Sequence, residues 1–316
     1  MKMILTRTPL RISFAGGMSD IPSYYKYNEG AVLSATIDKY VYIVKKEHFT
    51  NKYLLKYSQT EDVERITDIQ HNILREVMKN YNIKGGVEIG SFADIPVKGT
   101  GLGSSSSFTV GLVNALSGSI PKNQIAERAC DIELAVSDIG KQDQYAAAFG
   151  GINHIQFNSD DRVNVRLVDM DNKKWKELEN NLLMFYTGGI RKTNDILKNF
   201  KSFDIEYIDE LVKLSYSMRH QLITGNLEGF GKSMDRCWEL KRKTSKDISN
   251  EEIDYMYKKA KEAGALGGKL CGAGGGGFLL LYVPREHHST VRKTLNKYKE
   301  LKFKFDIEGT KVLHGN

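Results

Sequence analysis

The central feature of this chain is the segment Val97-Lys98-Gly99-Thr100-Gly101-Leu102-Gly103-Ser104-Ser105-Ser106-Ser107, which leads directly into the apolar residues 108–116. Alternate glycines let a backbone turn tightly with exposed amides, and serines that open a helix stand at its positive end. Such a turn is suited to holding phosphate. The P-loop pattern needs a Lys-Ser or Lys-Thr pair after its second glycine, which this segment lacks. On this segment alone, a flexible connector is the alternative interpretation.

Length and composition indicate a globular protein of two domains. The chain has 316 residues, of which 41% are hydrophobic and 27% charged, and these values are typical of soluble proteins. Its longest apolar run, 278–283, is too short to cross a bilayer. The first twelve residues lack the apolar core of a signal peptide. We therefore expect a cytoplasmic protein without membrane association.

The cysteines and the net charge exclude several classes of protein. Cys130, Cys237 and Cys271 are widely spaced and form no Cys-x-x-Cys pair, which argues against a disulfide framework and against a structural zinc site. The net charge of +7 is spread along the chain without interleaved recognition patterns, so we expect no nucleic-acid partner. A positive cleft would instead concentrate anionic small molecules.

Periodicity predicts an α+β fold. Leu10, Ile12 and Phe14 alternate with polar residues, which predicts a strand with Arg11 on its other face. Further strands are expected over 32–44, 87–95, 152–157, 278–283 and 302–307. Helices are expected around 69–77, 108–116, 121–136, 204–223, 226–243 and 286–298, and a further helix is expected to end near residue 263. This is not regular βαβ alternation. We place an N-terminal domain with the nucleotide-binding loop at 1–165 and a C-terminal domain at 166–316, with the boundary in a polar stretch.

A second glycine-rich segment, 272–277, formally satisfies G-x-G-x-x-G. It follows a predicted helix and precedes a predicted strand, whereas the dinucleotide-binding fingerprint follows a strand and opens a helix. We therefore exclude a Rossmann site.

Two acidic residues could complete a site for phosphoryl transfer, which needs a phosphate cradle, metal ligands, a group that orients the attacking hydroxyl and a nearby cation. Glu133 borders an apolar helical stripe, so it could bind magnesium together with a serine hydroxyl; a solvated helical glutamate is the alternative. Asp143 could accept the proton of an acceptor alcohol, or it could cap a helix.

Three separated segments resemble the three motifs of the GHMP kinases, the family of galactokinase, homoserine kinase, mevalonate kinase and phosphomevalonate kinase. The segments are Thr8-Pro9-Leu10-Arg11-Ile12, Gly101-Leu102-Gly103-Ser104-Ser105 and Gly272-Ala273-Gly274-Gly275-Gly276, and their order and spacing span the chain. The resemblance implies a two-domain architecture, with an N-terminal domain like ribosomal protein S5 domain 2 and a ferredoxin-like C-terminal domain. It also implies ATP as the phosphoryl donor and Mg²⁺ as the cofactor.

The resemblance implies roles for individual residues. Ser105 and Glu133 match the family's magnesium ligands, Asp143 matches its catalytic aspartate, and Arg11 matches a basic residue that lies near this aspartate. A guanidinium beside Asp143 would favour a role in orienting the acceptor over proton abstraction. The residues implied to bind ATP are Lys98, Gly99, Gly101, Leu102, Gly103, Ser104, Ser105 and Ser106.

Residues 14–22 and 140–151 resemble the sugar-kinase branch of the family. This implies that ATP phosphorylates the anomeric hydroxyl of a heptose phosphate and that Asp20 contacts sugar hydroxyls; a turn or helix-capping aspartate is the alternative. The substrate's own phosphate would require a cation. The implied substrate-binding residues are Gly17, Asp20, Arg191, Lys192, Gly274 and Gly275, with Lys241 or Lys243 as further candidate cations.

Two other functions stay open from the sequence. One is a kinase of fucose or another neutral sugar, which would not need the phosphate-binding cation. The other is a regulator of the same fold that binds nucleotide or nucleic acid without turnover. The expected partners are a small sugar phosphate and ATP, and a homodimer is left open.

Overall fold

The structure is a computed structural model that describes residues 3–96, 99–188 and 205–315. Within these residues the larger sheet has eight strands in the order β11-β1-β2-β5-β3-β4, with β6 on β2 and β7 on β6. All of its neighbouring strands are antiparallel except β3 and β5. Its strands are β1 (Met3–Ala15), β2 (Gly30–Glu47), β3 (Tyr53–Lys56), β4 (Thr60–Val63), β5 (Val87–Ala93), β6 (Ile152–Phe157), β7 (Val163–Leu167) and β11 (Lys311–Gly315).

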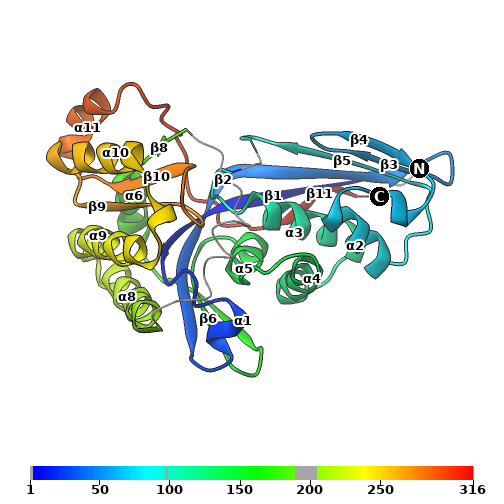
Figure 1. Cartoon of the computed structure of the whole chain (residues 1–316), viewed down its shortest axis with the longest axis horizontal. Helices are drawn as coiled ribbons and strands as arrows, with labels where there is room; N and C mark the ends of the chain where they lie inside the picture. Colours follow the sequence, from blue (N-terminus) through cyan, green and yellow to red (C-terminus); the bar gives the residue numbers. More distant parts are fainter. Residues whose placement is uncertain (1–2, 97–98, 189–204, 316) are drawn as a thin grey trace.

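Helices cover one face of this sheet (Figure 1). They are α2 (Asn72–Asn80), α3 (Ser104–Ser117), α4 (Lys122–Leu134) and α5 (Gln142–Phe149), while the short α1 (Pro22–Tyr25) follows β1. The middle of α3 is fully buried, with Val110, Leu112 and Val113 at 0% exposure. Because α3 packs against β1 and β2, the serines at its start are held at a fixed place beside the sheet.

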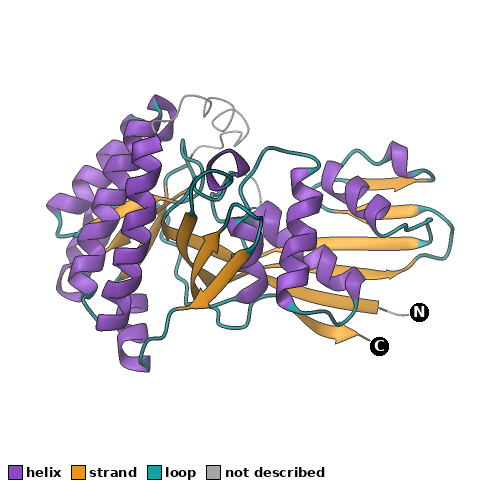
Figure 2. Ribbon diagram, turned by 90° about the horizontal axis from the view of Figure 1, so that it is seen from below, coloured by secondary structure: helices purple, strands orange, loops and turns teal. Residues whose placement is uncertain are grey.

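A second, antiparallel sheet has the order β8-β10-β9. Its strands are β8 (Leu182–Tyr186), β9 (Gly267–Leu270) and β10 (Phe278–Tyr282), and α6 (Asn172–Asn180), α8 (Ile205–Thr224), α9 (Leu227–Thr244), α10 (Glu251–Glu262) and α11 (His288–Thr294) gather around it. Figure 2 shows the long helices packed side by side at this end of the molecule. Helix α8 contacts β1 and β2, and α9 contacts β1. The second half of the chain therefore packs directly against the first.

The mixed helix and strand content confirms the predicted fold class, while several elements differ from the predictions. Residues 302–307 are not a strand, because Phe305 forms only an isolated bridge to Ile37. The predicted helix over 286–298 is shorter, a 3-10 turn followed by α11. The predicted boundary at 165/166 falls within β7, and β11 returns to pair with β1. The division into two domains at that point stays a prediction.

Among the helices that the structure describes, none is both long enough and apolar enough to cross a membrane.

Candidate active site

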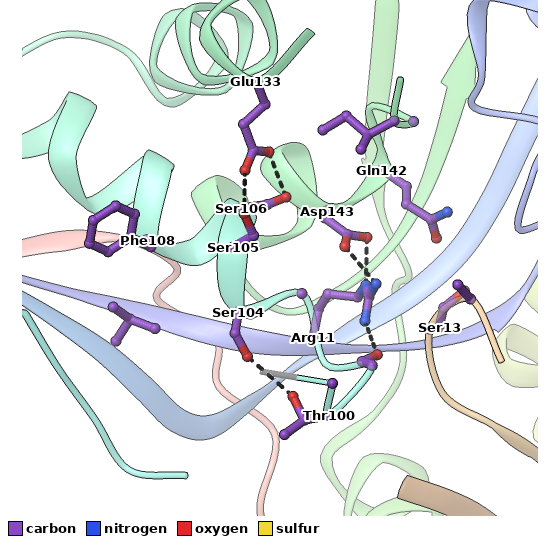
Figure 3. A pocket seen from close by; sticks show the side chains of 18 of the residues that line it. Arg11, Ser13, Thr100, Ser104, Ser105, Ser106, Phe108, Glu133, Gln142 and Asp143 are labelled. Carbon is purple, nitrogen blue, oxygen red and sulfur yellow. Dashed lines mark hydrogen bonds and ion pairs between the residues drawn. The ribbon is translucent and has the colours of Figure 1, made fainter. Parts of the chain in front are cut away.

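A cavity of about 1320 Å³ lies where the glycine and serine turn meets β1, the start of α5, and the α9–β9 region. Figure 3 shows its central side chains: Arg11 and Asp143 face each other, and Glu133 points toward Ser105 and Ser106. These residues come from four elements, β1, α3, α4 and α5. The structure therefore brings together the candidates that the sequence motifs suggested separately.

The turn that precedes α3 has the backbone geometry expected of a phosphate cradle. Helix α3 begins at Ser104, and Gly103 before it has a left-handed φ of 73°. Gly101 has the same φ, and a Cβ atom there would lie 2.3 Å from the carbonyl oxygen of Cys271. Gly101 therefore allows the second motif to touch the backbone of the third.

Arg11 forms a two-pronged ion pair with Asp143. Its Nε and Nη2 donate to the two carboxylate oxygens of Asp143, each at 2.6 Å, and its Nη1 donates to the carbonyl of Gly101, also at 2.6 Å. A Cβ atom on Gly103 would lie 3.1 Å from Arg11 Cγ and 3.2 Å from Asp143 Oδ2. This ion pair thus stands directly against the phosphate turn.

Glu133 is buried, with 2% exposure. Its carboxylate accepts hydrogen bonds from Ser105 (3.0 Å), Ser106 (2.7 Å), Thr109 (2.9 Å) and the Gln144 amide. Burial raises the pKa of Glu133, and these hydrogen bonds partly offset the rise. A solvated helical glutamate would have none of these features.

The residues around Glu133 fit a magnesium ion. The Glu133 carboxylate and the Ser105 hydroxyl both belong to residues that line the cavity, and they lie 3.0 Å apart, so two oxygen donors are available on its wall. The described residues include no cluster of three acidic, histidine or cysteine side chains. A metal here would therefore rely on one carboxylate, a hydroxyl, phosphate oxygens and water, which is a set typical of Mg²⁺.

Asp20 is 1% exposed and holds the start of α5. It accepts hydrogen bonds from the backbone amide of Gln142 (3.0 Å) and from Gln142 Nε2 (2.9 Å). Burial, together with the nearby charge of Asp143, raises the pKa of Asp20 to about 6. Asp20 and Gly17 both line the cavity. Asp20 therefore positions the helix that carries Asp143, and its contact with sugar hydroxyls stays a prediction.

The remaining candidates occupy different positions. Lys98, Arg191 and Lys192 lie outside the described residues. Gly99 and Lys241 line the cavity, whereas Lys243 is exposed. Leu102 is fully buried, and its carbonyl accepts the backbone amide of Arg11 at 3.0 Å, so its contribution is to hold the turn.

The third motif contacts the phosphate turn through its backbone. It joins β9 to β10, so two strands flank it and the exclusion of a Rossmann site holds. Gly272 and Ala273 line the cavity, while Gly274 and Gly275 are not among its lining residues. The amide of Gly275 donates to the carbonyl of Ile248 at 2.9 Å. A substrate-binding role for Gly274 and Gly275 stays a prediction.

Among the cavity-lining residues that sequence reasoning missed, Ser13, Gln142 and Lys269 carry polar side chains next to the predicted groups or in the cavity wall. Ser13 follows Arg11 by two positions and therefore shares its face of β1. Gln142 precedes Asp143. Lys269 lies in the short β9, whose other residues are two glycines and a leucine, so neither periodicity nor β-propensity marks this strand. A lysine three residues before a glycine motif was the available signal.

Comparison with known proteins agrees with this geometry. Residues 69–151 match the GHMP kinases N terminal domain, and residues 218–300 match the GHMP kinases C terminal model. The chain is 31% identical to the D-glycero-alpha-D-manno-heptose 7-phosphate kinase of Campylobacter jejuni, over 98% of this chain and 99% of that protein. It is 25% identical to the L-fucokinase/L-fucose-1-P guanylyltransferase of Bacteroides fragilis, over 92% of this chain and 35% of that protein.

A solved structure extends the similarity to three dimensions. The crystal structure of a D-glycero-D-manno-heptose 1-phosphate kinase from Bacteroides thetaiotaomicron superposes with a TM-score of 0.79 at 25% identity, over 98% of this chain and 99% of that one.

Proposed function

Since this chain belongs to the GHMP kinases, a family of ATP-dependent phosphotransferases that includes sugar kinases, we propose that it phosphorylates the anomeric hydroxyl of D-glycero-D-manno-heptose 7-phosphate. The product is the 1,7-bisphosphate, a precursor of nucleotide-activated heptose. Two observations support the proposal: the Arg11–Asp143 pair stands against the serine turn within one cavity, and the heptose 7-phosphate kinase relative matches along almost its whole length.

The chemistry follows from the arrangement of these side chains. The amides of the turn and the positive end of α3 hold the triphosphate of ATP. Asp143, fixed by two hydrogen bonds from Arg11, accepts the hydrogen bond of the anomeric hydroxyl and directs its oxygen at the γ-phosphorus. A new oxygen–phosphorus bond forms while the bond to the β–γ bridging oxygen breaks, and ADP leaves. The proton of the anomeric hydroxyl, which Asp143 holds in its hydrogen bond, is released to solvent as the new bond forms.

Magnesium would be held by the carboxylate of Glu133 and the hydroxyl of Ser105, together with phosphate oxygens and water, and when bound it would neutralise charge on the nucleotide phosphates. In the chain itself, Ser106, Thr109 and Gln144 orient the Glu133 carboxylate toward the start of α3. These hydrogen bonds prepare an oxygen ligand in a buried position.

A kinase of L-fucose or another neutral sugar is the second candidate, because the Bacteroides fragilis relative carries the name of a fucokinase. A substrate panel separates the two functions. ADP release is measured with heptose 7-phosphate, heptose 1-phosphate, free heptose, L-fucose and galactose at matched concentrations. We expect the highest kcat/KM with heptose 7-phosphate. Turnover of free fucose without turnover of heptose 7-phosphate would replace the first candidate with the second.

A further inference from the structure

Two lysine side chains from the second half of the chain are buried in the wall of the cavity. Lys241 on α9 is 8% exposed and Lys269 on β9 is 6% exposed, and both line the cavity. An ammonium group loses hydration when it is buried, so a buried lysine is normally matched by an anion. For Lys269, which has no acidic side chain among its partners in the described residues, this indicates that the anion comes from a ligand.

The two lysines differ in the contacts that they make with the protein. Lys241 donates to the backbone carbonyls of Gly272 and Leu270, which fixes it beneath the third motif. Lys269 forms no hydrogen bond or ion pair with another described residue. Burial raises the pKa of the neighbouring thiols Cys237 and Cys271, so these remain neutral. Neither thiol therefore serves as a counter-anion.

The pKa values of the two lysines reflect their burial and the positive charges near them. Burial lowers the pKa of both lysines, that of Lys241 to about 7, and the charge of Lys269 lowers the pKa of Lys241 further. Arg11 adds a third positive charge that acts on both lysines, although its guanidinium is paired with Asp143. The region is thus electropositive before any substrate binds.

Ser13 adds an unused hydroxyl to the same cavity. It is 5% exposed, and its Oγ is buried without a hydrogen-bond partner in the described structure. Figure 3 shows Ser13 on the side of Arg11 away from Ser104 and Ser105. A group bound at Ser13 would therefore be separate from nucleotide phosphates held at the turn.

We propose that Lys269 and Lys241, with Ser13, form a subsite for the phosphate group that the sugar substrate already carries. This inference rests on the proposed function, because it assigns one end of the same substrate. The subsite determines specificity and leaves the transfer chemistry to Arg11, Asp143 and the serine turn. Ammonium and hydroxyl donors form charge-assisted hydrogen bonds with a phosphate dianion. A neutral sugar has no such anion to accept them.

Lys269→Met is the primary test, because Lys269 has no hydrogen bond to lose within the described structure and Met has a similar length. We expect KM for heptose 7-phosphate to rise roughly 10- to 100-fold, as for the loss of a charged hydrogen bond, while KM for ATP changes by less than about twofold. The ratio of kcat/KM for heptose 7-phosphate to kcat/KM for free heptose should therefore fall. Lys241→Met should act in the same direction, and Lys232→Met, an exposed lysine of α9, serves as the matched control.

A second experiment supplies the phosphate separately. Inorganic phosphate should raise kcat/KM for free heptose in the wild-type enzyme and should not do so in Lys269→Met. The melting temperature of each variant is measured alongside, and we expect it to be unchanged or higher because a buried charge has been removed.

The outcomes separate the inference from the proposed function. If the wild-type enzyme turns over heptose 7-phosphate and Lys269→Met retains its KM, the subsite is wrong and the function stands. If the variant loses affinity for ATP alone, the lysine serves the nucleotide and the subsite is again overturned. If the wild-type enzyme does not use heptose 7-phosphate, the proposed function is wrong, and the subsite that rests on it is wrong as well.

Discussion

At the scale of single residues, the site depends on side chains whose position is fixed by a close partner. Arg11 donates two hydrogen bonds to the carboxylate of Asp143, and its remaining nitrogen donates to the carbonyl of Gly101. Asp143 is thereby held rigidly and keeps its orientation toward the phosphate turn. Rigid placement of the acceptor-orienting group is the main contribution that an enzyme makes to phosphoryl transfer.

Replacing the orienting carboxylate tests this role. Asp143→Asn should retain ATP binding but lose on the order of a hundredfold or more in kcat, because an amide accepts the substrate proton poorly. Steady-state kinetics and an equilibrium titration with ATP measure the two quantities separately. Turnover near that of the wild type would remove Asp143 from the mechanism.

The hydroxyl of Ser105 can be tested through the metal requirement. Ser105→Ala leaves Glu133 with hydrogen bonds from Ser106 and Thr109 but removes a proposed magnesium ligand. We expect the Mg²⁺ concentration for half-maximal activity to rise about tenfold. Ser119→Ala, at an exposed serine, should titrate like the wild type. An unchanged metal titration in Ser105→Ala would count against the assignment.

The buried lysine on α9 predicts a pH dependence of substrate binding. Burial lowers the pKa of Lys241 to about 7, so in the free enzyme this lysine loses its proton as the pH rises through 7. A bound phosphate stabilises the charged form and raises that pKa again, so binding at pH 8 takes up a proton. The substrate phosphate does not supply this proton change, because its own second ionisation lies near pH 6.

Calorimetry in buffers of different ionisation enthalpy measures this proton uptake. We expect about one proton to be taken up per molecule of heptose 7-phosphate bound at pH 8. The affinity for heptose 7-phosphate should fall as the pH increases above 7. The proton uptake should be much smaller in Lys241→Met. Equal heats in all buffers for the wild-type enzyme would show that Lys241 does not change its charge on binding.

At the scale of elements, two glycine-rich turns form the site by direct backbone contact. The φ of Gly101 is 73°, and a side chain there would collide with the Cys271 carbonyl. Gly118 has a φ of 68° but open space around it. The two glycines therefore share a backbone conformation, but a side chain would meet another part of the chain only at Gly101.

This pair of glycines gives a controlled prediction. Gly118→Ala should cost only the strain of a left-handed alanine, about 1 kcal/mol of unfolding free energy. Gly101→Ala should cost several kcal/mol and most of the activity, because the collision forces the two motifs apart. Chemical denaturation and turnover measure both effects. Equal losses in the two variants would show that the contact between the motifs is unimportant.

Some of the helices and strands could be predicted from the sequence, and others could not. Alternation identified β1, and the glycine and serine pattern identified the start of α3, because both signals are local. The sequence did not predict the strands β3, β4, β7, β8, β9 and β11, since each is at most five residues long. Residues 302–307 alternate like a strand, but Phe305 has only an isolated bridge to Ile37.

At the scale of the whole molecule, the two halves of the chain contribute different parts of one cavity. The first half supplies the serine turn, Arg11, Glu133 and Asp143, and the second supplies Lys241 and Lys269. Sequence motifs located the groups assigned to catalysis, because these lie within or near glycine-rich turns. Lys269 could be identified only from the fold, which packs β9 against α9 and puts Lys269 in the cavity wall, since nothing local distinguishes it from other lysines.

Phosphorus NMR of the reaction products tests the central claim most directly. Heptose 7-phosphate is incubated with the enzyme, ATP and Mg²⁺. The account predicts a new phosphomonoester signal that couples to the anomeric proton, in equal amount to the ADP formed, while the signal of the original phosphate remains. Formation of ADP with inorganic phosphate alone, or a new phosphate coupled to any other sugar proton, would contradict it.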